Sequence, residues 1–161
     1  MIVVLSSPEQ LESERLVGVY EAWKRITGER MAPRRDEITP ALVKTALPSV
    51  WMIDVVDGGK DFRFRIAGDR IIQFMGRRYA GHLVSEFTDQ PFFQDMRGIL
   101  KACTVEKRPM MVGPGRSRLA GKEHTELEVL VLPLSEDGAN VTTLFGAMEV
   151  RPLTKLPKGQ P

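Results

Sequence analysis

The sequence predicts an α+β fold: a five-stranded antiparallel sheet with helices on one face, preceded by two N-terminal helices. Three observations support this. Apolar residues recur at helical spacing near the N-terminus and again in the middle of the chain. Short alternating or continuous apolar runs, typical of strands, lie between and after these segments. Two turn signals, at residues 57–60 and 136–140, are typical of hairpins that join neighbouring strands.

Composition indicates one soluble domain. The chain has 161 residues, 42% hydrophobic and 27% charged, which suffices for a single core. The positive residues occur mainly in pairs and the net charge is only +2, so nucleic acid is not an expected partner. No segment approaches the roughly 20 apolar residues of a membrane span, so we expect no membrane partner. The single cysteine, Cys103, excludes an intramolecular disulfide and favours a cytoplasmic location.

Two helices are predicted in the N-terminal third. Residues 7–10 are typical of a helix start, because Ser7 can cap, a proline suits the first position and Gln10 completes a capping box. The helix should end at Gly28. Its apolar stripe consists of Leu16, Val19, Tyr20, Trp23 and Ile26. A basic connector over residues 29–37 then leads to a short second helix over residues 39–46, which Pro48 ends.

The next elements should be two strands and a short helix. Residues 50–56 are apolar on both faces, which predicts a central strand covered on both sides, with the N-terminal helix as one possible cover. Asp54 within this strand needs polar partners if it is buried. In residues 62–66, Phe62, Phe64 and Ile66 alternate with arginines, as in a half-buried strand. Asp69 can cap the short helix that follows.

A longer helix should start at Asp89 and run to about residue 106. Its apolar stripe consists of Phe92, Phe93, Met96, Ile99, Leu100 and Cys103. Gly98 inside it suggests a close approach to another backbone. Three strands are expected over residues 109–112, 123–132 and 141–150, the first interrupted by Gly113-Pro114-Gly115. We divide the chain into an N-terminal helix and connector (1–37), a main domain (38–150) and a disordered tail (151–161).

Several short sequences occur in a characteristic order. They are Trp23 with Gly28, residues 30–40, Leu47-Pro48 before residues 50–54, residues 62–68 followed by Ile71, and Gly76 with residues 79–81. Together with the order of elements, they resemble a PAS domain of a family of short stand-alone bacterial proteins. Asp69 and His82 depart from the residue types usual there, and both should lie near the mouth of a possible pocket. The resemblance implies a five-stranded sheet and a cytoplasmic signalling role, but no particular ligand.

Two sets of apolar residues are candidates for function. The first should converge between helices and sheet, either as a small-molecule cavity or as ordinary core, and consists of Phe64, Ile66, Phe74, Met75, Phe92, Met96, Leu100, Leu127 and Val129. Methionines there would let the site repack around a guest. The second set either covers the sheet or pairs with another chain in a homodimer, and consists of Leu16, Val19, Tyr20 and Trp23.

The resemblance also bears on cofactors. PAS domains that hold haem commonly use a histidine on the long helix, whereas His82 and His124 both lie outside that helix here. Photochemical flavin PAS domains use an Asn-Cys-Arg type motif, whereas Cys103 lies between alanine and threonine and is interpreted as a small buried hydrophobe. The cofactor is therefore unknown, with haem and covalent flavin disfavoured. Cysteine and histidine give no structural zinc pattern, and no metal is expected.

One polar cluster remains. His124, Glu126 and Glu128 share one face of a predicted strand, and if buried they could support acid–base catalysis. The alternate residues are more apolar, so we interpret the three as an outward, wet face. The predicted function is a non-enzymatic PAS-type sensory module that acts through contact with another signalling protein and is gated by a small apolar ligand. The alternatives are a small acid–base enzyme with its pocket in a curved sheet, and a ligand-free scaffold.

Overall fold

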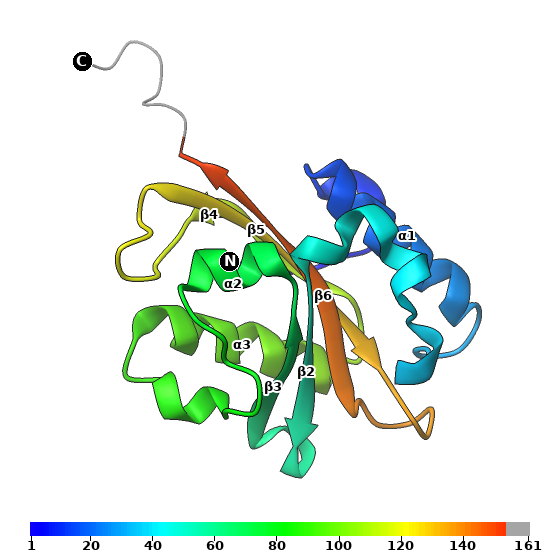
Figure 1. Ribbon diagram of the computed structural model, residues 1–161. Helices are drawn as coiled ribbons and strands as arrows, with labels where there is room; N and C mark the ends of the chain where they lie inside the picture. Colours follow the sequence, from blue (N-terminus) through cyan, green and yellow to red (C-terminus); the bar gives the residue numbers. More distant parts are fainter. Residues whose placement is uncertain (154–161) are drawn as a thin grey trace.

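The computed structural model describes residues 1–153, which form a six-stranded antiparallel sheet with helices on both faces (Figure 1). The strand order is β1-β4-β5-β6-β2-β3. The strands are β1 (Ile2–Val4), β2 (Val50–Val56), β3 (Asp61–Ala67), β4 (Met110–Arg116), β5 (Thr125–Leu134) and β6 (Thr143–Pro152). The predicted α+β class is confirmed. Of the expected disordered tail, residues 154–161 lie outside the described residues, while Arg151 and Pro152 belong to β6.

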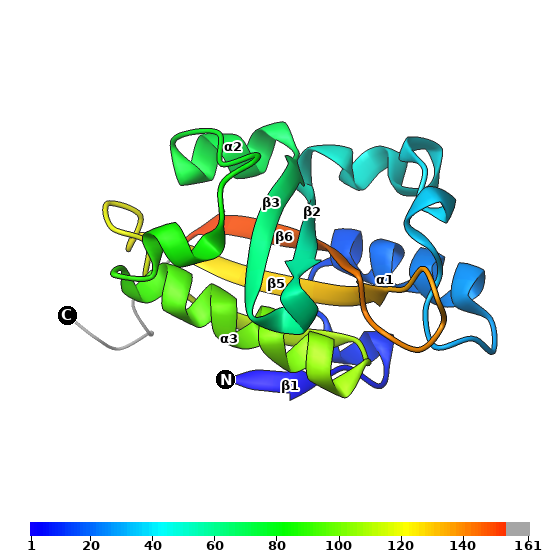
Figure 2. The ribbon, with the colours of Figure 1, turned by 90° about the horizontal axis from the view of Figure 1, so that it is seen from below.

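The sixth strand, β1, is the main difference from the predicted sheet. Ile2, Val3 and Val4 pair with Val112, Met111 and Met110 of β4. The Leu5 amide then donates to the Pro109 carbonyl at 2.9 Å. Figure 2 shows β1 at the sheet edge, next to α3 (Pro91–Glu106). Three residues are too few to show a period, so the apolar start of the chain gave no strand signal.

The N-terminal helix starts later than predicted. The capping box of Ser7 and Gln10 forms, but on a single 3-10 turn, η1 (Pro8–Gln10). The chain is extended at Leu11, and α1 (Glu14–Thr27) begins after Ser13, whose hydroxyl accepts from the Leu16 amide at 3.3 Å. The helix ends as expected at Gly28, which has a φ of +59°. The connector then forms η2 (Arg35–Glu37). The second helix follows as η3 (Pro40–Ser49), which is of the 3-10 type and includes Pro48, so the expectation that Pro48 ends it was wrong.

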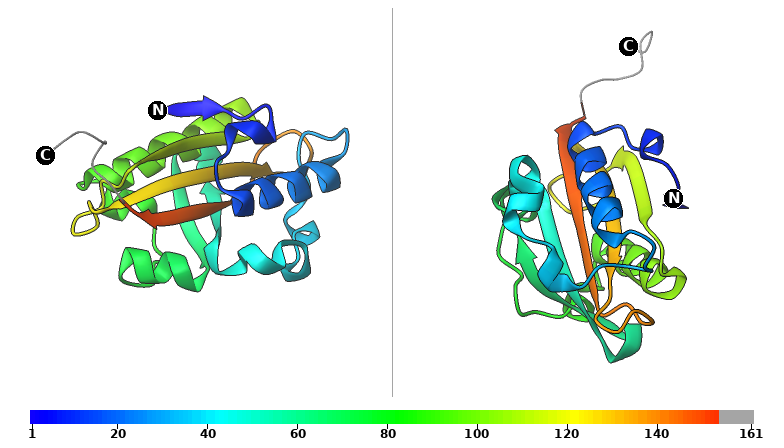
Figure 3. Two further views of the ribbon diagram at one scale, coloured as in Figure 1. Left: turned by 90° about the horizontal axis from the view of Figure 1, so that it is seen from above. Right: turned by 90° about the vertical axis from the view of Figure 1, so that its right-hand side faces the viewer.

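Helix α1 covers one face of the sheet (Figure 3, right). Its predicted stripe is buried against this chain's own strands: Leu16, Val19, Tyr20 and Trp23 are at most 5% exposed. The Trp23 indole donates to the Pro133 carbonyl at 2.9 Å. The stripe is therefore occupied within the chain and is not exposed to a second copy, so the role as an interface assigned to these four residues does not fit the structure.

The opposite face carries α2 (Asp69–Met75), η5 (Val84–Phe87) and α3. Helix α2 is capped by Gly68 and not by Asp69, and a side chain at Gly68 would overlap the carbonyl of Pro48. Helix α3 begins at Pro91, two residues later than predicted. The expectation for Gly98 was wrong, because a Cβ there would approach no backbone outside the helix and would meet only the Ile2 side chain, at 3.9 Å.

Strand β2 is internal, as predicted. Trp51 and Ile53 belong to the core on the α2/α3 face, while Val50 and Met52 belong to the core under α1. The Asp54 carboxylate is only partly buried and accepts from Arg65 Nη1 at 3.0 Å. The turn η4 (Asp57–Gly59) joins β2 to β3, as the hairpin signal predicted.

Candidate functional site

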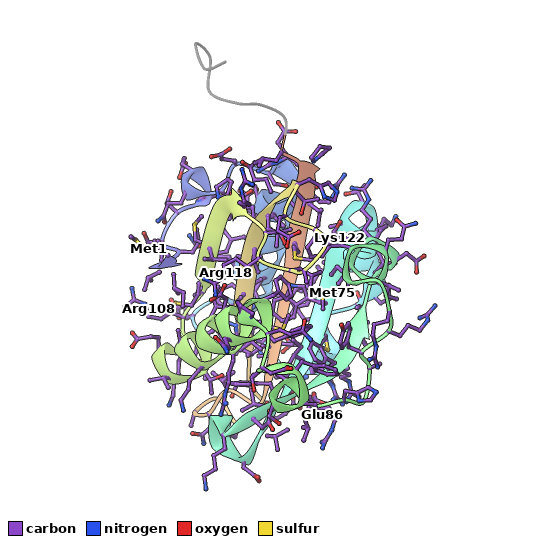
Figure 4. All side chains as sticks on the ribbon, turned by 90° about the vertical axis from the view of Figure 1, so that its left-hand side faces the viewer. Met1, Met75, Glu86, Arg108, Arg118 and Lys122 are labelled. Carbon is purple, nitrogen blue, oxygen red and sulfur yellow. The ribbon has the colours of Figure 1, made fainter. Side chains whose placement is uncertain are left out.

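A cavity of about 870 Å³ lies between the sheet and the helices α2 and α3. Its sheet side is formed by apolar residues of β2, β5 and β6, namely Trp51, Ile53, Leu127, Val129, Val131 and Met148. Its helical side is formed by Ile71, Ile72, Met75, Phe92, Met96, Ile99 and Leu100. Figure 4 looks onto this face of the molecule and labels Met75 of α2 and Arg118 of the β4–β5 loop, which both line the cavity.

The cavity is a space that the apolar side chains leave unfilled. Phe64, Met75, Met96 and Val129 pack against the core but stay only partly buried. Ile66 at the sheet edge is 53% exposed, although the alternation in β3 predicted an inward, covered position. Protein interiors are normally close-packed, and small-molecule sites are commonly clefts of about 300–1,000 Å³ with mostly apolar walls. This face of the sheet therefore has the form of a binding cleft.

Eight of the nine predicted pocket residues line this cavity. The exception is Phe74, which is 5% exposed and packs on Phe92 with ring centroids 6.1 Å apart. Contact of these residues with a ligand stays a prediction. Sequence reasoning missed Ile53 and Met148, although each lies in a predicted strand, because it could not tell which strands would lie side by side. It also missed Ile2 at the end of the cavity next to β1.

Polar residues line the cavity as well. The Arg118 guanidinium lies 3.0 Å from the Asp95 carboxylate and so links the β4–β5 loop to α3. Arg77 lies over the ring of Tyr79, 4.7 Å from its centroid, and both residues line the cavity. His82, which the resemblance placed near the mouth, does not line the cavity; its Nδ1 lies 3.1 Å from Glu86. The pKa of Glu86 is lowered mainly by the hydrogen bond from the Leu83 amide and, to a smaller extent, by the hydrogen bond with the His82 side chain.

The three polar residues of β5 and its approach do not converge. His124 is exposed, and Glu126 pairs with Arg151 at 3.2 Å. Glu128 is fully buried, so the expectation of a wet face was wrong at this position. Its side chain points to the α1 face, away from the cavity. The acid–base alternative required a histidine or carboxylate that points into the pocket, and none of these three residues lines the cavity.

Glu128 instead holds the start of α1. Its carboxylate accepts from the backbone amides of Glu12 at 2.7 Å and Ser13 at 2.9 Å. Opposite it on β6, Glu149 accepts from the Ser13 hydroxyl at 2.8 Å and from Arg15 at 2.9 Å. Carboxylates are stabilised at a helix N-terminus, where free amides point outward. We call these side chains of Ser13, Arg15, Glu128 and Glu149 the α1 clamp.

The α1 clamp and the cavity lie back to back on the same two strands. Successive side chains of a strand point to opposite faces. Leu127 and Val129 therefore line the cavity while Glu128 between them holds α1. On β6, Met148 lines the cavity while its neighbour Glu149 binds Arg15. A movement of either strand would therefore change both the wall of the cavity and the contacts that hold α1.

Cys103 lies in the core. Cys103 is fully buried on α3, and burial raises the pKa of its thiol. Its Sγ lies 3.3 Å from the Arg108 carbonyl, as suits a small core residue. Over residues 1–153, no group of three or more histidine, cysteine or acidic residues is arranged to hold a metal. In the same part of the chain, no helix is long and apolar enough to cross a membrane.

A family of known proteins matches most of the chain. Residues 11–149 match the profile of a family described as a PAS domain. Among solved structures, the PAS domain of histidine kinase ThkA is similar, with 12% sequence identity and a TM-score of 0.46 over 63% of this chain and 98% of that one. No curated protein matches the sequence. Because the family match spans most of the chain, this protein belongs to the PAS domain family, whose members are generally sensory and signalling modules.

Proposed function

We propose that this PAS domain senses a small apolar ligand in the cavity between the sheet and α2/α3, and that it passes its state to another signalling protein. The observation that carries the proposal is the unfilled cavity of about 870 Å³ with its apolar wall. A ligand there would cover the partly exposed Phe64, Met75 and Val129, and burial of apolar surface favours binding. The methionines on its helical side would let the site adapt to the ligand's shape.

The α1 clamp supports a route for the signal. A ligand that packs against Leu127, Val129 and Met148 acts on the strands whose other face holds the start of α1. If the occupied and empty states differ in the position of these strands, the ligand shifts the population of α1 arrangements by its difference in affinity for the two. A partner would then contact the exposed polar side of α1, since its apolar stripe is buried. A homodimer stays a prediction and needs a surface other than that stripe.

Native mass spectrometry of the freshly purified protein tests occupancy of the cavity. We expect an added mass that disappears on denaturation. In Val129→Phe the larger side chain fills part of the cavity, so the added mass should be lost or much reduced. Val105→Phe is the matched control, because Val105 is 64% exposed and lies outside the cavity lining. A bare chain mass for the unmodified protein would contradict occupancy and favour the scaffold alternative.

A further inference from the structure

The charged residues that line the cavity are almost all of one sign. Among the described residues 1–153, the charged residues of the lining are five arginines and one aspartate, with no lysine, glutamate or histidine: Arg65, Arg77, Arg78, Asp95, Arg116 and Arg118. Their formal net charge is +4, whereas the whole chain carries only +2. Positive charge is thus concentrated around the cavity and is not a general property of the surface.

Only part of this charge is neutralised by neighbouring carboxylates. Arg65 turns to Asp54 at 3.0 Å. Arg118 pairs with Asp95, but both side chains are more than half exposed, so this pair is worth less than about 1 kcal/mol and can be exchanged. Within residues 1–153, neither Arg77 nor Arg78 has a carboxylate within ion-pair distance. The same holds for Arg116, which sits across the β4–β5 ladder from Glu126.

The arginines border the open side of the cavity, whereas its interior is apolar. Arg77 and Arg78 follow Gly76, the C-cap of α2, whose left-handed backbone turns the chain away from the helix. Arg118 comes from the β4–β5 loop and reaches α3 (Figure 4). All three are exposed. Behind them, the buried side chains of the wall are apolar except for Ser117, with Ile53 and Leu100 as examples. We call these three exposed arginines, Arg77, Arg78 and Arg118, the arginine rim. A ligand that enters the cavity therefore passes from this basic rim into an apolar interior.

We propose that the ligand is an amphipathic anion, with an apolar chain inside the cavity and a carboxylate or phosphate head at the arginine rim. This inference rests on the proposed function, since it assumes that the cavity is occupied. Guanidinium groups bind both heads through paired hydrogen bonds, and they disfavour a cationic head. The rim is exposed, so the head group adds selectivity to an affinity that the apolar chain supplies.

Four probes with the same ten-carbon chain separate the head from the chain. Decanoate, decyl phosphate, 1-decanol and decylamine are titrated into the protein below their aggregation concentrations, with calorimetry as the readout. We expect one or both anions to bind about tenfold more tightly than 1-decanol, with decylamine weakest. The ratio should shrink as sodium chloride is added, because salt screens exposed charges. The ranking of decanoate against decyl phosphate distinguishes a carboxylate ligand from a phosphate ligand.

Charge variants connect any preference to the rim. In the double variant Arg78→Gln/Arg118→Gln, the anion preference over 1-decanol should fall to about twofold or less, while 1-decanol binding stays unchanged. Arg25→Gln removes the same charge from the exposed side of α1, across the sheet, and should leave the preference intact. Asp95→Asn removes the acidic residue of the lining and releases Arg118, so decanoate should bind about two- to fivefold more tightly.

The outcomes separate the two proposals. Equal binding of all four probes, or an anion preference that survives in the double variant, would overturn the amphipathic anion and leave the sensing of an apolar ligand intact. Failure of every probe to bind would count against both proposals. A gain in Asp95→Asn keeps the inference testable even if the double variant is poorly folded.

Discussion

The two faces of the sheet are built from the same strands but are packed differently. Under α1, Leu130, Leu132 and Leu134 of β5 are completely buried and form a closed core. On the other face, Val129 of the same strand and Val112 next to it stay partly exposed to a cavity. Figure 1 shows α1 on one side of the sheet and α2 and α3 on the other. One strand therefore serves both a filled interior and an open site.

The difference suggests that the two faces have separate tasks. The α1 face provides contacts that hold the sheet together, and interiors packed in this way tolerate little change in volume. The α2/α3 face can then leave space without loss of the fold. The α1 clamp connects them, since Glu128 lies on the filled face between two residues that line the cavity.

The largest effect is expected from Trp23→Ala. It removes a large buried side chain from the filled face together with the hydrogen bond to Pro133. The free energy of unfolding should fall by about 3–5 kcal/mol. The control is Met75→Ala on the α2/α3 face, which contains the cavity. It should cost less than about 2 kcal/mol because Met75 is only partly buried. Urea denaturation of both variants checks this, and equal losses would contradict the contrast between the faces.

Added volume gives the next contrast. Val19→Phe places extra atoms in the closed core under α1, where overpacking typically costs about 1–3 kcal/mol. The identical change at Val129 extends into the cavity and should cost less than about 1 kcal/mol. The comparison uses thermal unfolding of the two variants. Stabilities that fall by the same amount would mean that the space beside Val129 is not available to a side chain.

Loss of the α1 clamp should lower the free energy of unfolding by an intermediate amount, and its structural effect should stay local. Glu128→Gln presents an amide that satisfies the Glu12 and Ser13 amides less well than a carboxylate, at a cost of about 1–3 kcal/mol. Hydrogen exchange at these two amides should speed up relative to the rest of α1. Glu126→Gln, which breaks only the partly exposed pair with Arg151, should stay below about 1 kcal/mol. Faster exchange throughout the sheet in Glu128→Gln would refute a local clamp.

The smallest effect is expected when the pH is lowered, and it should be confined to the connector (residues 29–37). Arg30 and the Arg34 amide bind the Glu37 carboxylate and lower its pKa to about 2. A depressed pKa stabilises the folded state above the ordinary value near 4, and this contribution is lost as the pH falls toward 2. The Arg34 amide resonance should therefore titrate with a midpoint near 2, and Glu37→Gln should abolish this transition. A midpoint near 4 would contradict the observed pairing.

Much of the fold follows from periodicity in the sequence. The stripes of α1 and α3 and the alternation in β3 and β5 identified these elements because each is long enough to repeat. Helix starts were less accurate, since Ser7 and Ser13 are both good caps and only the second precedes an α-helix. The three residues of β1 carry no periodic signal and were missed.

The site was harder to predict than the fold. Apolar residues such as Phe64 and Met96 look the same in sequence whether they close a core or line a cavity. Burial of Glu128 depends on the amides of Glu12 and Ser13 just before α1, over 100 residues away in the chain, so strand alternation alone placed it in water. The arginine rim was missed because Arg78 and Arg118 come from separate connections, and only the folded chain brings them to one opening.

Tryptophan fluorescence tests the contrast between the faces most directly. The chain has two tryptophans: Trp51 lines the cavity, and Trp23 on α1 belongs to the core between α1 and the sheet. In Trp23→Phe, fluorescence comes from Trp51 alone and reports on the α2/α3 face with the cavity. In Trp51→Phe, it comes from Trp23 alone and reports on the filled α1 face. On titration with 1-decanol, we expect a saturable change in emission from Trp51 and none from Trp23. Equal responses from both reporters, or no response from Trp51, would contradict an open cavity on one face alone.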